Sequence, residues 1–171
     1  MTKRKTYKEN LKGLTFAALL AALYVALSYI CKAMGLLDGA IQLRFPEALC
    51  VLCSFTPYAV PGMALGCLLT NILTAAAPLD IIIGPIATLI GALFGRLIAK
   101  RTKKDLFGFL LVTLPTVLSN ALLMPPVIMY SYGAKMALPL VFLTVGIGEF
   151  LSASVMGAAL GTALKKVNLR I

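Results

Sequence analysis

The sequence predicts an all-α integral membrane protein, and composition, apolar run length and charge placement lead to this prediction. Of the 171 residues, 60% are hydrophobic and 13% are charged, and the mean hydropathy is +0.96. Several apolar runs reach the roughly 20 residues with which a helix spans a bilayer. The basic residues sit in short clusters that flank these runs. We therefore predict a single transmembrane domain over residues 1–171, in the cell membrane and without a nucleic-acid partner.

The positions of the basic clusters predict the topology. They cover residues 3–12, 96–104 and 165–170, and basic loops are retained on the cytoplasmic side of membranes. An even number of spans must then separate each pair of clusters, which places both termini in the cytoplasm. We predict six transmembrane helices, at about residues 14–34, 46–56, 61–77, 80–99, 106–124 and 136–163.

Individual helices follow from length and from helix-breaking residues. The apolar run 14–30 is longer than a usual signal-peptide core, so we interpret it as a retained first span. The stretch "FTPYAVPG" contains prolines and a glycine that interrupt a helix, so it divides residues 46–77 into two short helices. The stretch "PPVIMYSYGAK" is expected to form the outer turn between the last two helices.

The first helix carries two rows of small residues. Gly13, Ala17 and Ala21 form one row, and Ala18, Ala22 and Ala26 form an adjacent row. Small residues let two membrane helices approach closely. Two parallel rows exceed what one neighbouring helix requires, so either both pack within the chain or one row docks a separate membrane protein.

Polar residues gather at the predicted outer side, which suggests a ligand entrance. The asparagines within spans either form hydrogen bonds between helices or bind a ligand. Glu149 lies about 13 residues into the last helix, where an ionised carboxylate is costly unless it is paired or in contact with water. Arg44 either pairs with Glu47 or faces a ligand. If the acids line one cavity, it favours a ligand with a positive group or several N–H donors. The candidate ligand-binding residues are Gln42, Arg44, Glu47, Asn71, Asp80, Asn120, Tyr132 and Glu149, with Asp38, Tyr130 and Lys135 nearby.

Several kinds of chemistry lack their sequence signatures. The chain has no histidine and no G-x-x-x-x-G-K-[ST] loop, and its four cysteines lie in or beside apolar runs as small packing residues. We therefore predict no catalytic residues, no metal site and no cofactor. Binding or transport is the function that is left, with energy supplied by a partner.

Four sequence blocks resemble a known family. "IQLRFPEAL", "FTPYAVPGMALGCLLTNIL", "LDIIIGPIATLIG" and "VGIGEFLSASVMGAALG" occur in this order. They are similar to the queuosine-precursor transporter family (QueT), which are substrate-binding S components of energy-coupling factor (ECF) transporters. Two positions depart from the family pattern, because Pro46 and Pro85 stand where hydroxyl residues are expected.

The resemblance implies a fold, partners and a ligand. The fold is a six-helix S-component bundle that captures its ligand from outside. It associates with a transmembrane T component through Ala17, Ala18, Ala21 and Ala22, and two ATPase subunits drive uptake. The implied ligand is a 7-deazaguanine precursor of queuosine, such as preQ1 or queuine, bound first by Glu47 and Glu149. The alternatives are an S component for a different vitamin-like compound, or a membrane scaffold without a ligand.

Overall fold

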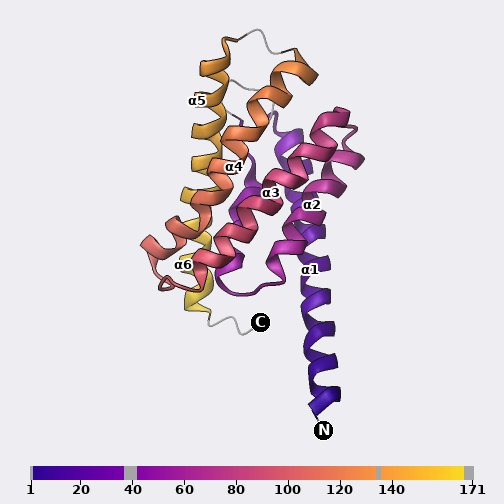
Figure 1. Cartoon of the computed structure of the whole chain (residues 1–171), viewed down its shortest axis with the longest axis vertical. Coiled ribbons are helices and arrows are strands. Elements are labelled where there is room, and N and C mark those ends of the chain that lie inside the picture. The colour runs from indigo at the N-terminus through magenta and orange to yellow at the C-terminus, as the bar shows by residue number, and fades with distance from the viewer. Residues whose placement is uncertain (1, 37–41, 134–135, 168–171) are drawn as a thin grey trace.

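The computed structural model describes residues 2–36, 42–133 and 136–167, and within these ranges the secondary structure is entirely helical (Figure 1). One segment, η1, is a 3₁₀ helix, and another, η2, is a π-helix that joins α5 and α6 into one continuous helix. The elements are α1 (Thr2–Ala33), η1 (Phe45–Ser54), α2 (Ala59–Leu73), α3 (Pro78–Ala99), α4 (Leu106–Tyr132), α5 (Leu138–Glu149), η2 (Phe150–Met156) and α6 (Gly157–Lys166).

Four of these helices are long and apolar enough to cross a membrane. They are Lys8–Ala33, Pro78–Ala99, Leu106–Tyr132 and Leu138–Lys166. The other two apolar helices, Phe45–Ser54 and Ala59–Leu73, have 10 and 15 residues. At about 1.5–2 Å per residue they reach only about 20 Å of a hydrocarbon core that is about 30 Å thick. Helices occur at all the predicted places, and the crossing of the membrane by these two remains a prediction.

The short helix η1 lies in the interior of the bundle. Nine of its residues, from Pro46 to Ser54, are buried. It contacts α1, α2, α3, α4, η2 and α6. Its cysteines, Cys50 and Cys53, belong with Cys67 to the main apolar core, and all four cysteines of the chain are buried free thiols. Cys50 and Cys53 are therefore packing residues.

The predicted outer turn at "PPVIMYSYGAK" is wrong for most of its length. Helix α4 continues through Pro125 and Pro126 to Tyr132, and the positive-φ residue Gly133 ends it. Two prolines remove two helix hydrogen bonds, but burial compensates for this loss. Met124 and Val127 pack with buried valines of α5 in a separate apolar cluster.

The first row of small residues on α1 packs against α2. Ala17 and Ala21 are buried, and the α carbon of each lies 3.2 Å from the position that a Cβ would occupy at Gly62 or Gly66. Ala18 and Ala22 are exposed on the other side of the helix. The two rows therefore differ, and among the described residues the first row packs against α2 while Ala18 and Ala22 stay exposed.

Replacing Gly66 with alanine is expected to destabilise the fold by about 1–3 kcal/mol, the usual cost of overpacking a dense interior. The new Cβ would lie 2.6 Å from the Cβ of Tyr24, so α1 and α2 would have to separate. Thermal unfolding in detergent measures the effect. The control is Leu65→Ala at a 45% exposed position, and equal stability of the two variants would contradict this packing.

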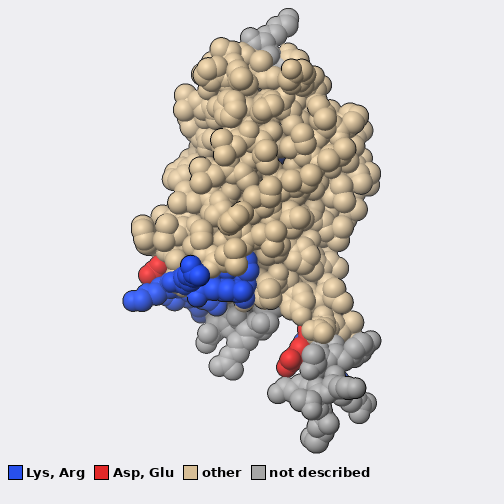
Figure 2. Space-filling model, in the orientation of Figure 1, with Lys and Arg blue, Asp and Glu red and all other residues tan. Residues whose placement is uncertain are grey.

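Basic side chains gather at one end of the molecule (Figure 2). Lys100, Arg101, Lys103 and Lys104 are exposed in the connection between α3 and α4. Exposed Lys165 and Lys166 end α6, and the N-terminus of α1 projects from the same end (Figure 1). This clustering is the arrangement that the positive-inside pattern requires.

Candidate functional site

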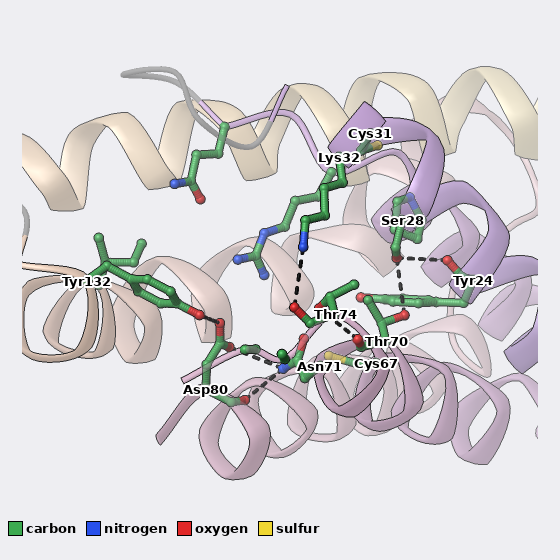
Figure 3. A pocket seen from close by; sticks show the side chains of 16 residues that line it. Tyr24, Ser28, Cys31, Lys32, Cys67, Thr70, Asn71, Thr74, Asp80 and Tyr132 are labelled. Atoms are coloured by element: carbon green, nitrogen blue, oxygen red, sulfur yellow. Dashed lines mark hydrogen bonds between the residues drawn. The ribbon is translucent and has the colours of Figure 1, made fainter. Parts of the chain in front are cut away.

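A cavity of about 550 Å³ (Figure 3) opens among helix ends that lie at the other end of the molecule from the basic α3–α4 connection (Figure 1). The C-terminal ends of α1, α2 and α4, the start of α3 and the segment before η1 form its walls. Pockets of about 300–1,000 Å³ are typical of small-molecule sites. The lining residues are Tyr24, Ser28, Cys31, Lys32, Gln42, Arg44, Pro46, Cys67, Thr70, Asn71, Thr74, Ala75, Ala76, Asp80, Ile128 and Tyr132.

Asp80 joins three helices at the rim of this cavity. It lies in the first turn of α3, where the helix dipole favours a carboxylate. Asn71 of α2 donates through Nδ2 to the backbone oxygen of Asp80 at 2.7 Å and to Oδ1 at 3.2 Å. Tyr132 of α4 donates to Oδ2 at 2.9 Å and accepts from the N–H of Ala77 at 3.2 Å. Three predicted site residues are therefore in contact, as Figure 3 shows.

Replacing Asn71 with aspartate is expected to destabilise the protein by about 2 kcal/mol or more. The change removes two hydrogen bonds to Asp80 and puts a second carboxylate beside the first, and like charges at contact distance repel. Thermal unfolding tests this, with Asn71→Ser as the variant that removes the amide without adding charge. Aspartate and serine variants of equal stability would contradict the contact.

Arg44 is held by its backbone, and its side chain has no hydrogen-bond partner among the described residues. Its N–H donates to Ser152 Oγ at 2.9 Å, which fixes the segment against η2. Among the described residues, the guanidinium forms neither a hydrogen bond nor an ion pair, so the predicted alternative of an Arg44–Glu47 pair is wrong. Burial lowers the pKa of Arg44, but the nearby charges of Glu149 and Asp80 outweigh it, and the pKa lies above its ordinary value. Arg44 is therefore a permanent cation facing the cavity.

Glu149 lies beside the cavity at the junction of α5 and η2. It is 3% exposed, and its Oε2 has no hydrogen-bond partner among the described residues. It lines a narrow crevice with Gln42 and Arg44, which also line the main cavity. The carboxyl group is close enough to Arg44 and to Glu47 to interact electrostatically with both. An unpartnered carboxyl oxygen in an apolar interior is costly, so the arrangement suits an added ligand donor.

Glu47 lies behind the cavity wall. It is fully buried in η1 and accepts a hydrogen bond from the phenol of Tyr24 at 2.5 Å. Its second oxygen, Oε2, has no partner within the described part of the chain. Of the three acids expected to share one cavity, only Asp80 lines the 550 Å³ space. Glu149 lines the adjoining crevice, which shares Gln42 and Arg44 with this space, and Glu47 lines neither.

The remaining predicted site residues are separated. Asn120 is 1% exposed and donates to the backbone oxygen of Thr116 within α4 at 3.2 Å, so it is away from the cavity lining. Tyr130 is 87% exposed. Asp38 and Lys135 lie outside the described residues.

Sequence reasoning missed the α1 and α2 side of the cavity. Tyr24, Ser28 and Cys31 recur at spacings of four and three residues on α1, and Thr70 and Thr74 do so on α2. These spacings place each set on one helix face. Lys32 also lines the cavity and donates through Nζ to the backbone oxygen of Thr74 at 3.3 Å. Helical spacing from Asn71 could have indicated Thr74, whereas no predicted ligand-binding residue lies on α1 to indicate its lining residues.

The described residues contain no group of three or more acids and cysteines able to hold a metal ion. The cavity is lined instead by hydroxyl, amide, carboxyl and cationic side chains together with apolar ones. This chemistry suits recognition of a polar small molecule.

Long apolar helices define a multi-pass cell-membrane protein, and a cavity that contains several polar side chains lies among their ends. The family model described as QueT transporter matches residues 14–166. The chain belongs to this family, and the family is one of transporters. A relative from Lactococcus lactis subsp. cremoris, described as queuosine precursor transporter QueT, is 32% identical over 107 residues. The match covers 63% of this chain and 60% of the relative. No solved structure matches the chain significantly.

Proposed function

We propose that this chain is the substrate-binding S component of an ECF-type importer for a queuosine precursor of the 7-deazaguanine type. Membership of the QueT transporter family supports transport. The observation that carries the proposal is the 550 Å³ cavity, lined by several polar and charged side chains, at the helix ends away from the basic loop. With the basic end in the cytoplasm, this cavity opens toward the outside and captures its ligand there.

The polar groups of the site complement a 7-deazaguanine. Its guanine-like edge carries adjacent N–H donors that one carboxylate accepts in a bidentate manner. Glu149 has an unpartnered oxygen for this role, and Asp80 offers a second carboxylate at the rim. Arg44 and Gln42 line both spaces and donate to the ligand carbonyl. A cationic aminomethyl group is stabilised by whichever carboxylate the ring edge leaves unused.

Energy for uptake comes from separate subunits in this proposal. A T component docks on α1, and two ATPases hydrolyse ATP in the cytoplasm. Because Ala17 and Ala21 are already packed against α2, the docking role falls to the exposed residues Ala18 and Ala22. Their small side chains permit the close approach that membrane helix contacts require.

Replacing Ala22 with leucine is expected to reduce copurification of the T component while leaving the melting temperature of the isolated chain unchanged. The added side chain would hold a partner helix away from α1. The matched control is Ala159→Leu, which adds the same bulk at an exposed position of α6. Equal copurification with both variants would contradict docking through this row.

The test of the proposal is the thermal stability of the detergent-purified chain with candidate ligands. The ligands are queuine, the 7-aminomethyl and 7-cyano 7-deazaguanines, guanine and a panel of unrelated vitamins. A ligand at a hundred times its dissociation constant stabilises the folded state by about 2.7 kcal/mol. Stabilisation by a deazaguanine alone is the expected result. Stabilisation by an unrelated vitamin would keep the S-component assignment and exclude a deazaguanine as its ligand. No stabilisation by any compound would favour a membrane scaffold without a ligand.

A further inference from the structure

Each hydroxyl group on the α1 and α2 side of the cavity already donates its proton in a hydrogen bond within the protein. A hydroxyl has one proton to donate and two lone pairs with which to accept. Tyr24 donates to Glu47 Oε1 at 2.5 Å, and Ser28 donates to the backbone oxygen of Tyr24 at 2.8 Å. Thr70 donates to Ser28 Oγ at 3.3 Å, and Thr74 donates to the backbone oxygen of Thr70 at 2.8 Å. The hydroxyl groups of this wall therefore offer a ligand only acceptor lone pairs.

The rim formed by α2, α3 and α4 has the same polarity. Tyr132 gives its proton to Asp80 Oδ2, and Asn71 directs its Nδ2 to the carboxylate and backbone oxygens of Asp80. The amide oxygen of Asn71 and the lone pairs of Asp80 are left to accept.

Donors come from another part of the lining. The guanidinium of Arg44 and the amide of Gln42 belong to the segment before η1, and the ammonium of Lys32 ends α1. Lys32 directs one donor to Thr74, which leaves two of its three N–H groups. The cavity thus has an acceptor wall and a separate set of donors.

Tyr24 has the most strongly fixed orientation on the acceptor wall. Figure 3 shows its ring reaching from α1 toward Cys67 and Thr70 of α2, and the residue is 3% exposed. Its partner Glu47 is fully buried, and Glu47 Oε2 has no partner among the described residues. Turning the phenol proton into the cavity would strip the Glu47 carboxyl of its hydrogen bond to Tyr24. The phenol oxygen is therefore held as an acceptor.

We propose that Tyr24, oriented by Glu47, is a specificity-determining residue that accepts an N–H of the ligand. One N–H group of the ligand then lies against α1 and α2, and the ligand carbonyl faces Arg44. Glu47 is a positioning residue in this arrangement, because it acts through the phenol without lining the cavity. The inference rests on the proposed function and adds the orientation of the ligand within the same site.

The test compares three probes that differ by single donor groups. They are 7-aminomethyl-7-deazaguanine, its analogue without the 2-amino group, and its analogue with 7-methyl in place of 7-aminomethyl. Wild type is expected to bind at least one analogue about tenfold more weakly than the parent compound, the usual effect of losing a hydrogen bond. In Tyr24→Phe, the dissociation constant of that analogue divided by that of the parent compound should fall to about one. The phenol oxygen that accepts the N–H is missing in this variant.

The matched control is Tyr29→Phe on the same helix. Tyr29 is 44% exposed, donates to the backbone oxygen of Leu73 and is not among the cavity-lining residues. This variant should keep the wild-type ratio for every probe.

Glu47→Gln tests the positioning role. A glutamine at this position can donate to the phenol oxygen, so the phenol proton becomes free to turn into the cavity. The difference in affinity between the parent compound and the analogue should therefore be smaller in this variant than in wild type. A merely structural role of Glu47 would lower the affinity for all three probes by one common factor.

The outcomes separate this inference from the proposed function. Binding of the probes by wild type without a donor penalty, or with a penalty that Tyr24→Phe retains, overturns the inference and leaves the proposed function standing. Failure of wild type to bind any deazaguanine overturns the proposed function, and the inference falls with it.

Discussion

Replacing Gly148 with alanine is expected to abolish ligand binding and to destabilise the fold by about 1–3 kcal/mol, as overpacking does. A Cβ at Gly148 would overlap the backbone carbonyl oxygen of Gln42, so the Gln42–Arg44 segment would have to move. That segment carries the donors of the site and is tied to η2 through the Arg44–Ser152 hydrogen bond. Thermal unfolding and ligand-induced stabilisation measure the two effects.

Gly146→Ala is the matched control on the same helix. A Cβ at this position would meet only the Cβ of Ala121, at an ordinary 3.8 Å. Alanine is also a better helix former than glycine by about 1 kcal/mol, so this variant should be as stable as wild type or more stable. Retained binding in Gly148→Ala would contradict the placement of the Arg44 segment.

Glu149→Gln is expected to weaken ligand binding by roughly tenfold to a hundredfold, the range of hydrogen bonds that involve a charged group. The amide keeps the size of the side chain and removes its charge. The stability of the ligand-free protein should stay the same or rise, because Oε2 is buried without a partner among the described residues and an unpaired carboxylate in an apolar interior is costly.

The control for this variant is Glu9→Gln, which removes a carboxylate at an exposed position near the basic end. It should leave both binding and stability unchanged. A large loss of stability in Glu149→Gln with undiminished binding would assign Glu149 a structural role, as the scaffold alternative requires.

The sequence predicted the helical segments well because each apolar run extends over most of a helix and the basic clusters lie at helix ends. It failed where tertiary packing overrides a local signal. Pro125 and Pro126 indicate a turn, yet α4 continues because Met124 and Val127 are buried against α5. Lys8 and Lys12 mark the membrane edge without ending the helix, so α1 begins at Thr2 and extends beyond the predicted span.

Prediction of the site was less complete, for a physical reason. Charged and amide side chains in apolar runs are unusual, so Asn71, Asp80 and Arg44 could be selected from the sequence, and the cavity contains them. Serine and threonine are not unusual there, because they bond to the carbonyl one turn earlier, as Ser28 and Thr74 do. Only the packing of α1 on α2 shows which hydroxyls face the cavity.

The most direct measurement of the central claim is equilibrium binding of radiolabelled 7-aminomethyl-7-deazaguanine to the purified chain in lipid nanodiscs, without partner subunits. We expect saturable binding of one ligand per chain, displaced by unlabelled queuine and not by adenine, and lost in Gly148→Ala but not in Gly146→Ala. Absence of saturable binding, or equal binding by both glycine variants, would contradict capture of a deazaguanine in this cavity.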